Sequence, residues 1–369
     1  MAGIYVHIPF CRSRCLYCGF YSTTRHDLRQ RYVEALGREW SLRQDYIDLS
    51  RVRTIYIGGG TPSQLSADQL RQLFAMLGDV TAGCEEVTIE CNPDDVTSAY
   101  AELLSQLPVN RVSMGAQTFC DQRLQFLRRR HLSAQIPVAV QRLRDAGIGN
   151  ISVDLMYGFP DETLDDWRHD IQEALALQVE HLSAYALMYE EGTPLYRLLQ
   201  KGEVCEVDEE LSRQMYYELK DRLEAAGYEH YEISNFARTG FRSRHNSSYW
   251  NQTPYLGLGA AAHSFDGRSR GWNVDDVEAY IESIEQGQLP YEQEQLDADT
   301  RYNELVMTAL RTCEGLRLDL LTERQQRYCL AQAQRYISDH LLIHEAGRLR
   351  LSRSGLFVSD MVMSDLMLV

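Results

Sequence analysis

The sequence contains no long hydrophobic run and no excess of positive charge. Its apolar stretches fall well short of the roughly 20 residues that a helix needs to span a bilayer. Lysine and arginine together number 37, against 53 aspartates and glutamates, so the formal net charge is −16. Phosphate backbones and anionic membranes repel such a surface, which argues against nucleic acid as a partner.

The first residues also lack a basic leader, an apolar signal segment and a cleavage site, because a strand-like run directly follows Met-Ala-Gly. We therefore expect a cytoplasmic protein, whose thiols stay reduced. Its nine cysteines should then be ligands or packing residues rather than disulfides. The 369 residues suffice for a large domain with a sizeable core and a smaller second domain.

Strand-like and helix-like segments alternate from the N-terminus to about residue 235. One helical pattern places Tyr32, Leu36 and Trp40 on a common apolar face, and Ser66 precedes a second helical segment as an N-cap would. Strand–helix alternation favours a parallel sheet, and six such units predict an α/β fold with a partial (β/α)6 barrel. The predicted strands are 4–9, 53–59, 86–91, 111–117, 151–158 and 181–187.

Two regions follow the predicted barrel core of residues 1–235. Residues 236–290 are aromatic and glycine-rich, too polar for buried helices, and predict an appended sheet or a long loop. Residues 291–369 return to helical periodicity and end in two apolar runs around Ala346-Gly347, which predicts a hairpin. Helices followed by a hairpin are typical of a small winged-helix domain. Without a basic face, we expect it to be a packing or partner module.

Three cysteines, Cys11, Cys15 and Cys18, follow the first predicted strand with the spacing C-x3-C-x2-C. A structural zinc site would need four ligands, whereas three thiolates suit an open site such as a 4Fe-4S cluster with one free iron. The alternative is three buried small residues in a turn. The remaining cysteines show no ligand spacing and are expected to be packing residues: Cys84, Cys91, Cys120, Cys205, Cys313 and Cys329.

Glycines and polar residues end the predicted strands, where a (β/α) barrel assembles its site. The second strand runs into the glycine triplet 58–60, which lets backbone groups approach a ligand closely. Glu90 ends the third strand and could accept hydrogen bonds from ribose hydroxyls, Gln117 ends the fourth, and Asp154 lies in the fifth. Each feature is weak alone, because glycine runs are often turns and strand-end carboxylates are often solvated. Together they favour a barrel over a doubly wound sheet.

The cysteine spacing resembles the signature of radical S-adenosylmethionine (SAM) enzymes, in which an aromatic residue, here Tyr17, commonly precedes the last cysteine. The resemblance implies a 4Fe-4S cluster on Cys11, Cys15 and Cys18. In that superfamily the free iron binds the amino and carboxylate groups of SAM. One electron from the cluster then cleaves a carbon–sulfur bond and produces a 5′-deoxyadenosyl radical.

The segments YVHIPFCRSRCLYCGF, GGGTPS, ECNP and DLMYGFP resemble the branch containing oxygen-independent coproporphyrinogen III dehydrogenase and the HemW heme chaperones, over essentially the whole chain. The dehydrogenase has a fourth cysteine where this chain has Phe20, and HemW-type proteins have phenylalanine there. Arg128 departs from the family, which usually has Gly-Arg-x-His at this point. The positions that match SAM contacts are Tyr5, Gly59, Gly60, Thr61, Glu90, Gln117, Arg129, Asp154 and Ala186, with Tyr17 beside the cluster.

The segments HNSSYW (245–250) and GLGAAAHS (257–264) also resemble HemW-type proteins, where they are associated with heme binding. His245 and His263 are therefore candidate heme contacts, because an accessible imidazole can ligate heme iron. Tyr249 and Trp250 would add flat apolar surface. The alternative is that His245 forms local hydrogen bonds while Tyr249 and Trp250 pack against the barrel.

The resemblance favours a heme chaperone that binds heme and passes it to a hemoprotein acceptor, for example a respiratory or membrane-associated one. The cluster and SAM would then act in a supporting or regulatory way. The second hypothesis is oxidative decarboxylation of coproporphyrinogen III, against which Phe20 argues. A third is radical methyl transfer or another small-molecule reaction on the same scaffold.

Overall fold

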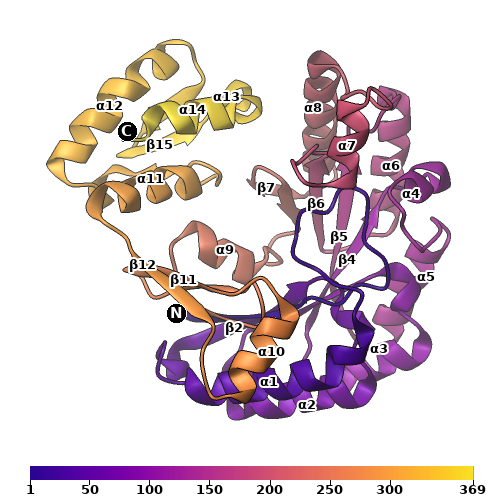
Figure 1. The fold of residues 1–369 in the computed structure, drawn as a ribbon. Coiled ribbons are helices and arrows are strands. Elements are labelled where there is room, and N and C mark those ends of the chain that lie inside the picture. The colour runs from indigo at the N-terminus through magenta and orange to yellow at the C-terminus, as the bar shows by residue number, and fades with distance from the viewer. Residues whose placement is uncertain (369) are drawn as a thin grey trace.

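The computed structural model describes residues 1–368 and contains a sheet of twelve strands (Figure 1). Six adjacent strands at its centre are all parallel, which confirms the predicted partial (β/α)6 barrel. Two of the predicted strands, 86–91 and 111–117, have the observed bounds. The six are β1 (Ala2–Ile8), β2 (Val52–Gly59), β3 (Glu86–Cys91), β4 (Arg111–Gln117), β5 (Asn150–Tyr157) and β6 (His181–Ala186).

Helices between these strands cover the outside of the sheet (Figure 1). The apolar face predicted for the first of them is buried, including Tyr32, Leu36 and Trp40. Ser66 caps the second helix, and Gln69 completes a capping box with it. The helices between the strands are α1 (Arg29–Leu42), α2 (Ala67–Leu77), α3 (Ser98–Ser105), α4 (Asp121–Phe126), α5 (Gln135–Asp145) and α6 (Leu164–Ala176), and α7 (Pro194–Gln200) and α8 (Glu209–Ala225) follow β6.

Residues 236–290 form more than an appended sheet or loop. They extend the main sheet, because β9 pairs in parallel with β1, and they contain two helices with buried faces. The expectation that this segment is too polar for a buried helix was wrong, since the polar groups of its first helix find partners inside the protein. Within and directly beside this segment, the elements are β7 (Glu229–Glu232), β8 (Asn235–Ala237), α9 (Arg244–Trp250), β9 (Tyr255–Leu258), β10 (His263–Phe265), β11 (Ser269–Asn273), α10 (Val277–Glu285) and β12 (Tyr291–Gln295).

The C-terminal part has its own hydrophobic core and a three-stranded antiparallel sheet. The predicted hairpin is present, with Ala346 and Gly347 at positive φ in its turn, as a two-residue hairpin loop requires. This winged-helix-like domain stands apart in yellow in Figure 1. Its elements are α11 (Ala298–Ala309), β13 (Leu316–Arg317), α12 (Glu323–Ser338), β14 (Leu342–Glu345), β15 (Arg348–Leu351), α13 (Arg353–Phe357) and α14 (Ser359–Leu366).

The main hydrophobic core extends along the chain to Ile284, and the second core begins at Tyr302. The predicted boundary after residue 290 lies between them, whereas the one after residue 235 falls within β8. The three-part division of the chain stays a prediction. No helix within residues 1–368 is both long and apolar enough to cross a membrane.

Candidate cluster and nucleoside site

The loop after β1 carries the three cysteines and lies across the ends of the central strands (Figure 1). Backbone hydrogen bonds hold it in place: Cys11 N–H donates to Thr23, and Leu16 N–H donates to Leu127. Leu195 N–H in turn donates to the carbonyl of Leu16. The loop is therefore held by backbone hydrogen bonds and does not need the three thiols to keep its conformation.

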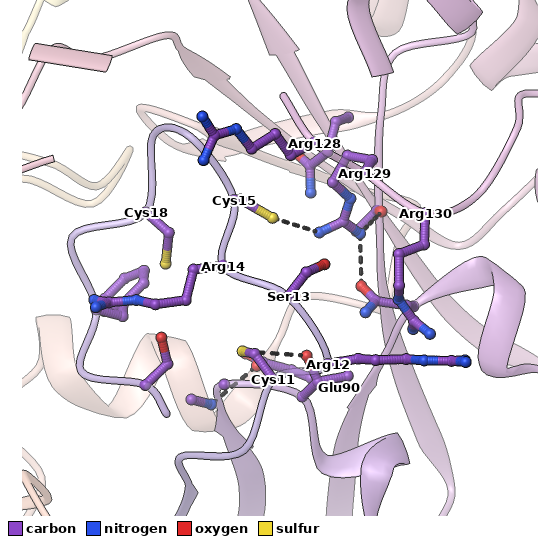
Figure 2. A pocket seen from close by; sticks show the side chains of 18 of the residues that line it. Cys11, Arg12, Ser13, Arg14, Cys15, Cys18, Glu90, Arg128, Arg129 and Arg130 are labelled. Atoms are coloured by element: carbon purple, nitrogen blue, oxygen red, sulfur yellow. Dashed lines mark hydrogen bonds between the residues drawn. The ribbon is translucent and has the colours of Figure 1, made fainter. Parts of the chain in front are cut away.

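The three thiols border one cavity, and Figure 2 shows their sulfurs around a common space. Thr61 Oγ1 lies 3.5 Å from Cys11 Sγ, and a guanidinium N–H of Arg129 lies 3.5 Å from Cys15 Sγ, so both can donate to thiolates. Burial raises the pKa of the Cys18 thiol to about 11. A bound metal ion would offset this cost of burying the thiolate, because its positive charge stabilises the deprotonated form.

Across residues 1–368, no three His, Cys, Asp or Glu side chains surround a single point as the ligands of one ion would. An iron–sulfur cluster makes a different demand, because each cysteine binds a different iron and the thiolates stand around a cube. Three thiols with hydrogen-bond donors beside two of them fit that group.

Arg129 is one of five arginines that line the cavity. Its Nη2 donates to Asn92 Oδ1 at 2.6 Å and to the carbonyl of Gly115 at 2.7 Å, while its buried Nε has no partner in the described residues. Arg128, next to it, has φ +62°, in the left-handed region that favours glycine. A glycine would adopt this backbone without the strain that a Cβ causes.

The glycines after β2 are required by close contacts. A Cβ on Gly59, whose φ is +108°, would lie 2.4 Å from the His7 ring, and one on Gly60 would lie 2.7 Å from the backbone of Pro9. Gly59 and Gly60 therefore form a wall made of backbone only, as the sequence predicts for a ligand that approaches closely.

Two half-buried carboxyls face the cavity. Glu90 accepts from the Tyr56 hydroxyl at 2.7 Å and from the Gly59 N–H at 3.0 Å, and burial raises its pKa to about 7. Asp154 accepts from Ser113 Oγ at 3.4 Å, and burial raises its pKa to about 6. Strongly shifted carboxyls at strand ends in a cavity are typical of ligand-binding sites.

The structure brings most of the predicted site residues together but leaves four outside the cavity lining. Tyr5 stacks on Tyr56, and Ala186 lies at the end of β6. His245 and His263 lie elsewhere, on α9 and β10. The predicted residues that do line the cavity are Cys11, Cys15, Tyr17, Cys18, Gly59, Gly60, Thr61, Glu90, Gln117, Arg129 and Asp154.

His245 is inaccessible as a heme contact in this structure, which corrects that expectation. It is fully buried, its Nδ1 lies 2.9 Å from Thr54 Oγ1, and its Nε2 lies 2.8 Å from the Tyr249 hydroxyl. Both ring nitrogens are engaged, so neither is open to iron. The local hydrogen-bonding alternative describes this residue, and Trp250 packs beside the Arg311 guanidinium, 5.1 Å from ring centroid to Cζ.

His263 is different. It is exposed on β10, its ring lies 6.1 Å from that of Trp272 on β11, and no hydrogen bond to another described residue engages it. Gly257 makes room for this strand, since a Cβ there would lie 1.9 Å from the His263 carbonyl oxygen. Of the two predicted histidines, it is the one that solvent can reach.

Tyr56, the hydrogen-bond partner of Glu90, was not predicted from the sequence, although Thr54, Tyr56 and Gly58 alternate along β2 and therefore share one face. The packing role expected for the other cysteines suits the buried Cys91 and Cys329. It was wrong for Cys205 and Cys313, which are exposed because they lie in loops.

Comparisons with known proteins agree with this geometry. Residues 5–174 match the Radical SAM superfamily, and residues 296–358 match the HemN C-terminal domain. The heme chaperone HemW of Bacillus subtilis is 36% identical over 89% of this chain and 88% of its own length. HemW of Mycobacterium tuberculosis is 34% identical over 99% and 94%. The solved structure of Escherichia coli coproporphyrinogen III oxidase (HemN) has the same fold, with a TM-score of 0.84, 21% identity, and coverage of 99% of this chain and 90% of that one.

Proposed function

Because this chain belongs to the HemW family of radical SAM proteins, we propose that it is a heme chaperone, which binds heme and passes it to a hemoprotein acceptor. The relatives at 34–36% identity carry that name. The single observation that carries the proposal within the chain is Phe20, which lines the mouth of the cavity and is 72% exposed. An exposed phenylalanine stands where the decarboxylating relative has its fourth cysteine.

We assign the cofactors to the cavity described above. Cys11, Cys15 and Cys18 would hold a 4Fe-4S cluster, whose free iron would bind the amino and carboxylate groups of SAM. The chain's own residues then bind and orient the nucleoside. Glu90 would accept hydrogen bonds from ribose hydroxyls, Gly59 and Gly60 would admit the amino acid part, and Arg129 would donate to the Cys15 thiolate.

The heme contact that we propose is His263. Its imidazole is accessible, and the Trp272 ring beside it offers apolar surface to a porphyrin. Replacing His263 with alanine should weaken heme binding and change the heme absorption spectrum, whereas His245→Ala should leave both close to wild type. Equal loss in the two variants would contradict this assignment.

The experiment that tests the function compares two activities of the reconstituted protein under anaerobic conditions. Loaded with heme, it should transfer heme to an apo-hemoprotein such as apomyoglobin, followed by the acceptor's absorption. Incubated with coproporphyrinogen III, SAM and a reductant, it should form no protoporphyrinogen. Protoporphyrinogen formation would replace the chaperone by the dehydrogenase, and Phe20→Cys tests whether this residue separates the two.

The place of action and the acceptor are part of the same proposal. All nine cysteines are free thiols, which suits the reducing cytoplasm. The net charge of −16 means that a hemoprotein acceptor would meet this surface through a basic or apolar patch of its own.

A further inference from the structure

A buried column of side chains connects helix α9 to the wall of the cavity. The His245 ring stacks on Tyr56, with centroids 5.3 Å apart and planes inclined by 29°. The Tyr56 hydroxyl donates to Oε1 of Glu90 at 2.7 Å. These three residues, His245, Tyr56 and Glu90, are called the support column below.

The base of the support column is fixed by hydrogen bonds from three directions. Thr54 and Tyr249 engage the two ring nitrogens of His245. The buried carboxylate of Glu86, at the start of β3, accepts the backbone N–H groups of Arg244 at 2.8 Å and of His245 at 2.9 Å. Glu86 thus satisfies donors at the N-terminus of α9 and holds His245 in place.

Two glycines make room for the support column. A Cβ on Gly3 would lie 3.0 Å from Thr54 Oγ1 and 3.2 Å from Cε1 of His245. A Cβ on Gly58 would lie 2.7 Å from the Tyr56 ring and 2.9 Å from Oε1 of Glu90. Both ends of the column therefore pack against a glycine, Gly3 beside His245 and Gly58 beside Glu90, where any side chain would be too close.

The top of the support column leaves Glu90 little freedom. Tyr56 holds one carboxylate oxygen, and the Gly59 N–H holds the other at 3.0 Å. The carboxylate faces a cavity whose other walls carry the cysteines and Asp154. Burial lowers the pKa of His245 to about 3, so its ring stays neutral and can stack in the interior without a buried charge.

From these contacts we infer that His245 is a positioning residue for the nucleoside site, acting through Tyr56 on the orientation of Glu90. The inference rests on the proposed binding of SAM in this cavity. It gives the histidine of HNSSYW a role in holding SAM rather than heme. Preorganised carboxylates bind more tightly because less freedom is lost when the ligand arrives.

Calorimetric titration of SAM into the reconstituted, oxidised full-length protein tests the inference. Tyr56→Phe keeps the stacked ring and removes one hydrogen bond, and SAM should bind about tenfold more weakly. His245→Ala should give a similar loss, and His245→Phe, which keeps a flat ring on Tyr56, should regain most of it. His344→Ala, on the exposed hairpin strand β14, is the matched control, with iron content equal in all variants.

The pH dependence of SAM binding separates positioning from a loss of folded protein. Glu90 is faced by five groups, which are Tyr5 on β1, Tyr56 on β2, Arg111 on β4, Asp154 on β5 and Tyr249 on α9. The Tyr56 hydrogen bond favours the ionised form of Glu90, so both column variants should move the midpoint of SAM binding to higher pH. A variant that is only less stable would lose affinity without moving this midpoint.

The outcomes distinguish the inference from the proposed function. Wild-type protein that takes up no SAM would contradict the proposed cofactor. Wild-type binding with unchanged affinity and midpoint in both Tyr56→Phe and His245→Ala would overturn the inference alone. Loss of heme uptake in His245→Ala with unchanged SAM binding would also overturn it, since the imidazole would then be a heme contact.

Discussion

The cysteine loop and helix α9 carry the chain's two most conspicuous motifs, CRSRCLYC and HNSSYW, and their side chains lie in opposite environments. The loop is held by backbone hydrogen bonds, and its three thiols face a cavity (Figure 2). In α9, His245 is fully buried with both ring nitrogens hydrogen-bonded. The thiols of the first motif are available to a ligand, whereas the histidine of the second is hydrogen-bonded inside the protein.

The difference teaches how to interpret a chemically rich motif. A histidine beside a tyrosine and a tryptophan suits a heme site when only its neighbours in the sequence are known. Whether it binds a ligand depends on partners far away in the chain, here Thr54 and Glu86. Substitutions in the loop should therefore change ligand binding with little effect on stability. Substitutions around α9 should lower stability, with or without a change in ligand binding.

Removing a loop cysteine should have the largest effect on function and a small one on folding. Cys15→Ala should lose nearly all cluster iron, because three thiolates are the fewest that hold three of the four irons. Iron and acid-labile sulfide per chain measure the loss, and the thermal midpoint measures the fold. Cys205→Ala, at an exposed cysteine, is the control. Full iron content in Cys15→Ala would show that the loop is not the cluster site.

Glu90 lies where the two regions meet and should make stability depend on pH. Its folded-state pKa of about 7 exceeds its ordinary 4.5, so folded protein holds the proton more tightly and stability falls as pH rises between these values. Glu90→Gln removes this titration. Relative to wild type, it should gain about 3 kcal/mol of unfolding free energy between pH 4.5 and 7.

Urea unfolding at several pH values measures this difference, with Glu102→Gln on α3 as the control for losing an exposed carboxylate. Asp154, whose pKa is raised to about 6, titrates in both proteins, so it cancels in the comparison except for its repulsion of the ionised Glu90. A difference between Glu90→Gln and wild type that does not change with pH would mean that this carboxyl is not perturbed by burial.

The regular parts of the fold could be predicted because their signals are local. The six barrel strands and the hairpin at Ala346-Gly347 follow from short apolar runs and turn residues. Pairing of β9 with β1 could not be predicted, since β9 has four residues and its partner lies some 250 residues earlier in the chain. Only the folded chain brings the two together.

The same reasoning applies to the site. The cysteines, Gly59, Gly60 and Glu90 could be recognised because motif and strand end coincide. Tyr56 could not be separated from a core aromatic, because its function depends on a hydrogen bond to the next strand. Burial of α9 was missed because the carboxylate that satisfies its N-terminus belongs to Glu86, on the third strand.

Replacing Glu86 tests whether its carboxylate holds helix α9 in place. Glu86→Ala leaves the N–H groups of Arg244 and His245 without their acceptor, the second of them buried, and should lower the unfolding free energy by about 2 kcal/mol. Its neighbour Glu85 forms an exposed ion pair with Arg244, so Glu85→Ala should cost about 0.5 kcal/mol or less. Urea unfolding of both variants decides. Equal effects would mean that α9 is not held by the Glu86 carboxylate.

Arg128, which follows α4 and lines the same cavity as the cysteine loop, tests whether the backbone of the cavity wall is strained. At φ +62°, a residue with a Cβ costs about 1 kcal/mol, which glycine avoids, although glycine also loses more freedom on folding. Arg128→Gly should therefore be more stable by about 0.5 kcal/mol. Arg128→Ala keeps the Cβ and removes the guanidinium, so its difference from Arg128→Gly isolates the backbone contribution.

If Arg128→Gly is no more stable than Arg128→Ala, the left-handed backbone is not the reason for glycine in the family. If it is more stable but binds SAM or heme more weakly than wild type, the arginine of this chain is retained for the ligand in spite of its backbone.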